Sequence, residues 1–299
     1  MSKKPTQKNL PKFITLSAGS VAMTALFAFL GAIPLRGLKT AAGSFTYWAL
    51  GLIVSGILLG IEQYYLAGAY ACLVLVVGAF SELEDMELSR GWAAFWAVSL
   101  VSLVFSAGLA FWIASVGKVW WSQLLALMEV PLNQVLKINP ETTITSKDLL
   151  LQTPAVLIIL SILALYVSML FEPRVLKLFK QAPVQRMSLK KLKVSDAMIW
   201  IFLASLLGAF LNHKVEVIKV VSLNGFYVMI TLYFFQGLAI VSELFEKIKL
   251  GAAWQLFGYF ILITQLMLLL CLVGIADFWF DFRSRLKKSK QEEINREIF

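Results

Sequence analysis

Any chemistry in this sequence has to come from a few polar residues beside or inside long apolar runs. Glu62 follows one run, Gln236 lies within "YFFQGLAIVSE", and Asp277 stands at the apolar edge of "LVGIADFWFDF". An amide or a carboxylate in hydrocarbon is costly unless it is paired or faces a cavity. Glu62, Gln236 and Asp277 are therefore candidate ligand-binding residues. The alternatives are a surface turn at Glu62 and a hydrogen bond between two helices at Gln236.

We expect Gln236 and Asp277 to face the interior of a helix bundle. Gln236 lies in the middle of its apolar run, where its amide needs hydrogen-bond partners. A carboxylate at the edge of the hydrocarbon must find a partner or take up a proton. The sequence therefore predicts that Asp277 meets a donor from another helix.

Patterns typical of enzymes and metal sites are not found in the sequence. The single histidine, His213, has no Ser, Cys or metal-ligand neighbours and reads as an interfacial residue. The two cysteines, Cys72 and Cys271, lie inside apolar runs without a CxxC spacing, and no Gly-rich phosphate loop is present. We therefore expect no enzymatic activity, no metal and no cofactor.

Composition points to the lipid bilayer as the solvent of this chain. Hydrophobic residues make up 59% of the 299 residues and charged residues 15%, whereas a soluble domain carries about 25% charge. The mean hydropathy is +0.78. The formal net charge of +9 comes from cations between the apolar runs, which is typical of lipid headgroup contacts and not of a nucleic-acid-binding surface.

The apolar runs predict an all-α, polytopic membrane helix bundle. The first run, 13–35, is longer than the roughly 7–15 apolar residues of a signal peptide, so we expect a retained helix. About eight hydrophobic helices are expected, at 13–35, 45–60, 65–81, 92–116, 154–171, 197–211, 221–244 and 252–278. Residues 13–282 would form a single transmembrane domain, flanked by cytoplasmic basic segments at 1–12 and 283–299.

Two features of the connections bear on topology. Residues 122–138, "SQLLALMEVPLNQVLKI", predict an amphipathic helix on the membrane surface, interrupted at Pro131. Eight crossings place both basic termini in the cytoplasm but leave the segment 172–196, with its seven Lys and Arg, outside. Six net crossings would place all three in the cytoplasm. The sequence leaves both arrangements open.

The first apolar run also contains alanines spaced three and four residues apart. On one continuous helix they would form a stripe of small side chains, which lets another helix approach closely in lipid. The stripe either packs internally or docks a separate integral membrane subunit. Its members are Ala18, Ala22, Ala25, Ala28 and Ala32.

The segments "QGLAIVSELFEK" and "LVGIADFWFDFRSRL" carry a resemblance to a known family. Over about 212–286 the chain resembles the YybS-like family of bacterial inner-membrane proteins, whose function is unassigned. That family looks related in fold to the substrate-binding subunits of energy-coupling-factor vitamin transporters, and more distantly to the rod-shape protein MreD. The resemblance implies a multi-pass protein of the bacterial inner membrane, with the alanines docking a coupling subunit. No vitamin-binding motif is recognisable, so no substrate is implied.

These observations leave two main hypotheses for function. The first is a small-molecule binding or uptake subunit that works with a partner. The alternative is a membrane scaffold or assembly factor for cell-envelope proteins, and a transporter that works alone is a third. A binding subunit needs an enclosed pocket with convergent polar groups, whereas a scaffold needs a packed core and an exposed face of small residues.

Overall fold

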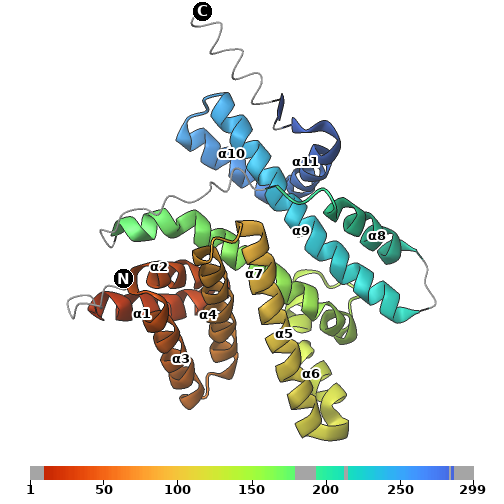
Figure 1. Cartoon of the computed structure of the whole chain (residues 1–299). Helices are drawn as coiled ribbons and strands as arrows, with labels where there is room; N and C mark the ends of the chain where they lie inside the picture. Colours follow the sequence, from red (N-terminus) through yellow and green to blue (C-terminus); the bar gives the residue numbers. More distant parts are fainter. Residues whose placement is uncertain (1–9, 179–192, 212–214, 283, 286–299) are drawn as a thin grey trace, which may run out of the picture. The chain divides into compact units, whose positions relative to one another are not determined.

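The computed structural model describes residues 10–178, 193–211, 215–282 and 284–285. In these ranges the chain forms helices and turns and no strand (Figure 1). The helices are α1 (Leu10–Leu26), α2 (Ala32–Ala42), α3 (Ser44–Gly60), α4 (Tyr64–Asp85), α5 (Arg90–Val116), the short 3-10 helix η2 (Gly117–Val119), α6 (Trp120–Ile138), α7 (Ser146–Leu178), α8 (Met198–Phe210), α9 (Glu216–Lys247), α10 (Ala252–Thr264) and α11 (Met267–Phe280). The predicted all-α membrane class is confirmed.

The number of long apolar helices is lower than the eight expected. Within the described residues, four helical stretches are long and apolar enough to cross a membrane. A fifth is counted if α10 and α11, which are bent by 94°, form one span. The other expected helices are shorter, at 17 residues for α3 and 13 for α8. The four stretches are Tyr64–Asp85, Arg90–Ile138, Ser146–Lys177 and Glu216–Lys247.

The first expected helix, 13–35, is broken because the chain folds back on itself after Leu26. Ser20 Oγ donates a hydrogen bond of 2.8 Å to the carbonyl of Gly31. A Cβ atom at Gly31 would lie 2.0 Å from Thr24 Oγ1 and 2.8 Å from the Ser20 carbonyl, so only glycine fits this close approach. Apolarity alone did not reveal this turn.

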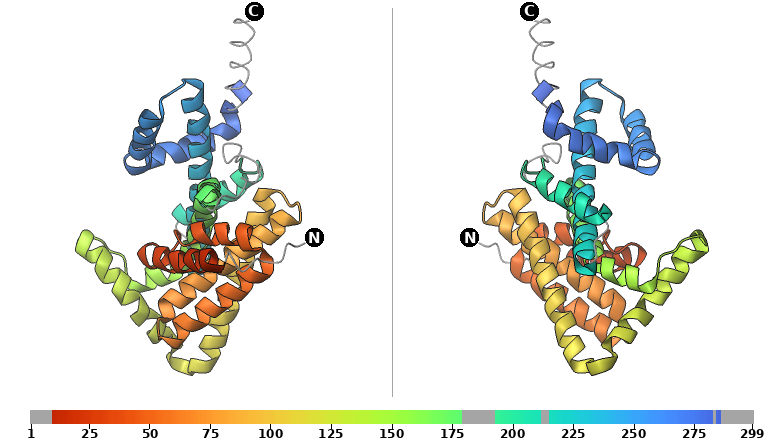
Figure 2. Two further views of the ribbon diagram at one scale, coloured as in Figure 1. Left: turned by 90° about the vertical axis from the view of Figure 1, so that its left-hand side faces the viewer. Right: turned by 90° about the vertical axis from the view of Figure 1, so that its right-hand side faces the viewer.

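Contacts divide the chain into two compact units, Met1–Gln185 and Arg186–Phe299. In the first unit α3, α4 and α5 are consecutive helices joined by short turns, and α4 packs against both of the others (Figures 1 and 2). Helix α2 packs against α1, α3, α4 and α7, and its residues from Ala32 to Lys39 are all buried. The prediction of one transmembrane domain over 13–282 stays a prediction.

Close helix approach in the first unit depends on small residues, as is usual in lipid. Between α3 and α4, a Cβ atom at Gly51 would lie 2.5 Å from Val74 Cγ1, and one at Gly78 would lie 2.5 Å from the Trp48 ring. Tyr47 is fully buried in this contact and its hydroxyl donates to the Val74 carbonyl at 2.8 Å. The pair therefore combines tight packing with a satisfied buried hydroxyl.

In the second unit α9 packs against α8 and α11. The contact with α8 pairs glycine with serine, because a Cβ atom at Gly208 would lie 2.1 Å from Ser222 Oγ. The contact with α11 brings the backbones together, since a Cβ atom at Gly237 would lie 2.0 Å from the Leu270 carbonyl oxygen. Helix α11 is therefore fixed closely across α9.

Helix α6 runs through Pro131 without a break, contrary to the expected interruption. None of its residues is buried. Its location on the membrane surface stays a prediction.

Candidate functional site

Among the described residues of the first unit, the two cations of α2 are the most deeply buried Lys and Arg side chains. Arg36 has an exposed fraction of 0% and Lys39 one of 5%. Both lie on the central helix, which neighbouring helices surround. A buried charge is costly unless it is paired and hydrogen-bonded, so the partners of these side chains decide what the site can do.

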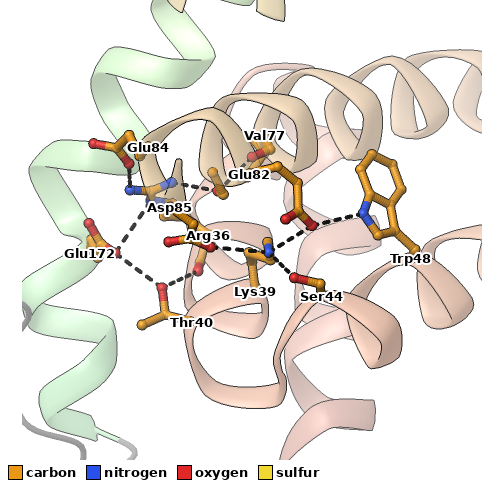
Figure 3. Close-up of polar contacts among 11 residues, drawn as sticks. Arg36, Lys39, Thr40, Ser44, Trp48, Val77, Glu82, Glu84, Asp85 and Glu172 are labelled. Carbon is orange, nitrogen blue, oxygen red and sulfur yellow. Dashed lines mark hydrogen bonds and ion pairs between the residues drawn. The ribbon is translucent and has the colours of Figure 1, made fainter. Parts of the chain in front are cut away.

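Arg36 is held by side chains of two neighbouring helices, α4 and α7 (Figure 3). From α4, Ser81 Oγ and a Glu84 carboxylate oxygen accept hydrogen bonds from its two Nη groups. From α7, Glu172 Oε1 lies 3.3 Å from Arg36 Nε. The guanidinium carbon also lies 5.1 Å from the centre of the Phe80 ring, a cation–π contact. The guanidinium is thus compensated by two carboxylates from different helices.

Lys39 forms the second half of the site. Its Nζ donates to Glu82 Oε1 at 2.9 Å and to Ser44 Oγ, and lies 3.5 Å from Asp85 Oδ2. Trp48 Nε1 donates to the same Glu82 oxygen at 3.2 Å. A Lys beside a Ser can act as a general base only when the Lys is neutral. Here Lys39 Nζ is engaged by two carboxylates and donates to Ser44 Oγ, so the geometry is that of an ion-paired structural lysine.

Further contacts extend the Arg36 half, and the two halves share helices α2 and α4. Arg90, the first residue of α5, has Nε 3.0 Å from Glu84 Oε1. Thr40 Oγ1 donates to Glu172 Oε1 at 3.1 Å. We call the two halves together the ionic cluster, and its charged members are Arg36, Lys39, Glu82, Glu84, Asp85, Arg90 and Glu172.

The ionic cluster connects α2, α4, α5 and α7, and Ser44 and Trp48 add α3. Three cations face four carboxylates, so the charges nearly balance. Removing one partner of a buried ion pair leaves an uncompensated charge and costs about 3–5 kcal/mol. The arrangement therefore fixes how these helices pack.

Sequence reasoning missed this site. Arg36 and Lys39 lie three residues apart, just beyond the first apolar run, 13–35. The segment 81–90, "SELEDMELSR", is strongly acidic. Two cations on one face of a helix, together with an acidic segment elsewhere in the sequence, were the signal that could have predicted this ion pairing. Arg36 and Lys39 were interpreted as charges at the membrane–water interface, because the run 13–35 was expected to be one helix that ends at the membrane surface.

The structure brings Gln236 and Asp277 together. Gln236 Nε2 donates to Asp277 Oδ2 and to the Gly274 carbonyl, both at 3.1 Å. The backbone N–H of Val194 donates to Gln236 Oε1 at 2.8 Å. Both side chains are buried, at 2% and 3% exposure. Their predicted interior position is confirmed, as is the donor to Asp277 from another helix, whereas ligand binding stays a prediction.

Glu62 occupies a different environment. It lies in the exposed turn between α3 and α4 of the first unit and has a left-handed φ of 62°. This geometry matches the surface-turn alternative. His213 lies outside the described residues.

The five alanines do not form one stripe, because α1 ends at Leu26. Ala18, Ala22 and Ala25 are exposed on α1, Ala28 is half-buried in the following turn, and Ala32 is buried at the start of α2. The opposite face of α1 is buried and carries Phe13, Leu16, Ser17, Ser20 and Thr24. The predicted small-residue face is therefore limited to the three alanines of α1.

Comparisons with known proteins identify the family but no characterised relative. No curated protein matches the chain, and no solved structure does. The family described as "Predicted membrane protein (DUF2232)" matches residues 12–278, which include the ionic cluster and the Gln236–Asp277 pair. This chain therefore belongs to the DUF2232 family of membrane proteins.

Proposed function

We propose that this chain is a non-enzymatic, multi-pass protein of the bacterial inner membrane that holds a second integral membrane protein against the exposed face of α1. In this role it acts as a scaffold or assembly factor for cell-envelope proteins. The observation that carries the proposal is the orientation of α1, whose buried face includes Ser20 and Thr24 and whose alanine face is exposed.

The alanine face suits helix docking. Ala18, Ala22 and Ala25 lie on successive turns, and a Cβ atom at Gly19 would meet no atom within 4 Å. In lipid, helices gain little from apolar area alone, so association depends on close approach over small residues. A face of this kind fits a helix of another membrane protein.

The inner face of α1 supports the same role because it fixes the helix in place. Ser20 Oγ bonds to the Gly31 carbonyl, and Thr24 Oγ1 donates to the Ser20 carbonyl at 2.7 Å. Helix α2, against which α1 packs, is held in turn by the ionic cluster. A partner would therefore meet a preorganised surface, which lowers the entropic cost of binding.

A substitution at Ala22 tests the proposal. The tagged full chain is expressed at its native level, extracted in mild detergent, and its co-isolated membrane proteins are quantified by mass spectrometry. Ala22→Leu places a bulky side chain on the docking face and should lower recovery of the partner by roughly tenfold or more, which corresponds to about 1.4 kcal/mol. Because Ala22 is exposed, the variant should remain inserted and monodisperse.

Ala110→Leu is the matched control, because Ala110 is an exposed alanine on α5. It should leave the recovered proteins unchanged. Equal recovery from wild type and Ala22→Leu, or equal losses from both variants, would contradict docking on α1.

A second candidate is a small-molecule binding or uptake subunit that uses the same face of α1 for its coupling partner. The fully buried Arg36 favours it, because ionisable groups inside membrane proteins often mark substrate or ion pathways. The resemblance to vitamin-binding subunits points the same way. Mass spectrometry of small molecules extracted from the purified chain separates the two: a stoichiometric ligand, lost in Gln236→Leu while the fold survives, indicates uptake.

A further inference from the structure

Several helix ends of the first unit meet at α2. Gly37 shows this directly, because a Cβ atom there would lie 2.4 Å from Val175 Cγ1 of α7 and 3.9 Å from Leu16 Cδ2 of α1. Val175 is near the C-terminus of α7, and Leu16 is in the N-terminal half of α1. The start of α1 and the end of α7 are therefore on the same side of α2.

The ionic cluster adds the ends of two more helices to this group. Glu84 is in the last turn of α4 and Arg90 is the first residue of α5. The two side chains form an ion pair with each other, and Glu84 also pairs with Arg36. Thus the end of α4, the start of α5 and the end of α7 meet at one end of the unit.

The end of the first unit opposite to the ionic cluster contains the turn between α3 and α4 and the end of α5. Helix α4 has 22 residues, about 33 Å at 1.5 Å each, which is enough to cross a bilayer. The turn between α3 and α4, with Gln63, is at its other end. Helices α4 and α5 pack together after a short turn, so α5 carries the chain back to that far end, where Lys118 follows.

More cations of the described first unit are at the cluster end than away from it. The cluster end includes Lys12, Arg36, Lys39, Arg90, Arg174 and Lys177. Lys118 is at the far end of the α3–α4–α5 hairpins, and Lys137 and Lys147 are in the last turn of α6 and the first turn of α7. Short loops rich in Lys and Arg stay in the cytoplasm. Within 172–196 the chain carries seven Lys and Arg, so the basic segment after α7 leaves from the same end.

We propose that the cluster end of the first unit faces the cytoplasm and that its exposed cations form a rim that binds the phosphates of anionic lipids. Lys12, Arg174 and Lys177 are exposed, whereas Arg36 and Lys39 are buried among carboxylates. The exposed cations are thus available to headgroups, and the cytoplasmic leaflet supplies anionic ones. This orientation places the N-terminus and the segment 172–196 on the same side, as the arrangement with six net crossings does.

Vectorial labelling tests the sidedness. In a full chain whose native Cys72 and Cys271 are replaced by Ser, single cysteines are introduced as Lys12→Cys, Lys177→Cys, Gln63→Cys and Lys118→Cys. All four positions are exposed. A membrane-impermeant maleimide should label the first two only in inverted vesicles and the last two only in intact cells. Labelling of Lys12→Cys and Lys177→Cys from opposite sides, or of both from outside, overturns the proposal.

Native mass spectrometry tests the lipid rim. The purified full chain is titrated with phosphatidylglycerol and, separately, with phosphatidylcholine. Combining Lys12→Gln, Arg174→Gln and Lys177→Gln should weaken phosphatidylglycerol binding by roughly tenfold or more, because each cation near a headgroup contributes to attraction. Phosphatidylcholine binding should not change, and Lys118→Gln is the matched control. Equal phosphatidylglycerol binding by the wild type and the triple variant overturns the rim.

Discussion

At the scale of single residues, Arg36 combines full burial with two carboxylate partners. Its guanidinium contacts Glu84, Glu172 and Ser81 and lies over the Phe80 ring. Replacing both partners of a buried ion pair by apolar groups can be neutral, but removing one is strongly destabilising. This asymmetry makes the ionic cluster testable by mutation.

Arg36→Leu should lower the free energy of unfolding by about 3–5 kcal/mol, because Glu84 and Glu172 would lose their shared cation inside the unit. Unfolding of the purified chain in mixed micelles, followed by circular dichroism, measures the change. Adding Glu172→Gln to Arg36→Leu should recover part of the loss. Lys118→Gln, at an exposed position, is the control. A change within about 0.5 kcal/mol for Arg36→Leu would show that the cluster does not hold the fold.

Gln236→Leu should destabilise the second unit by about 1–3 kcal/mol, because Asp277 Oδ2 and the Val194 N–H would each lose a buried hydrogen bond. Asp277→Asn keeps an acceptor for Gln236 and should cost less. Thermal unfolding in detergent measures both. Gln265→Leu, at the exposed end of α10, is the matched control and should have little effect. If Gln236→Leu proves no more destabilising than this control, the pair is not structural.

The polar residues show how far sequence reasoning reaches at this scale. Gln236 and Asp277 could be predicted to meet a partner because an amide or carboxylate in an apolar run has few alternatives. Glu62 could not be assigned because a turn and a cavity both tolerate it. Arg36 was missed because its burial depends on the position of α2 among four other helices, which apolar length does not encode.

At the scale of helices, close backbone contact between α9 and α11 is the feature most sensitive to a single methyl group. Gly237→Ala should destabilise the α9–α11 contact, because the new Cβ would lie 2.0 Å from the Leu270 carbonyl oxygen and 2.8 Å from its carbon. Overpacking of this kind costs about 1–3 kcal/mol or more. Faster hydrogen exchange in α11, measured by mass spectrometry, is the expected result.

Gly56→Ala is the comparison, because a Cβ atom there would meet nothing within 4 Å. An alanine favours an exposed helix interior by up to about 1 kcal/mol over glycine, so this variant should be as stable as the wild type or slightly more stable. Equal exchange in α11 for both variants would contradict the close crossing.

The existence of most helices could be predicted from hydropathy, but their breaks could not. The turn after α1 requires Gly31 to pack against Ser20 and Thr24. The bend between α10 and α11 falls at Gln265 and Leu266, inside the run 252–278 that was expected to be one helix. The first break comes from contacts between residues that a periodic pattern does not relate. With these breaks, fewer helices are long enough to cross a membrane than the eight expected.

At the scale of the whole molecule, membership of the DUF2232 family and the all-α architecture establish a membrane protein. The central claim of the proposed function is that the alanine face of α1 touches another membrane protein. Lipid is the alternative neighbour for an exposed helix face. A contact measurement in the intact membrane distinguishes the two.

Site-specific photo-crosslinking makes that measurement. A photoreactive phenylalanine analogue placed at Ala22 of the full chain, and at exposed Leu52 of α3 as the control, is activated in living cells. We predict one discrete protein adduct from Ala22, identified by mass spectrometry as an integral membrane protein, that Leu52 does not give. Lipid adducts alone from Ala22, or the same protein adducts from both positions, would contradict a docking face on α1.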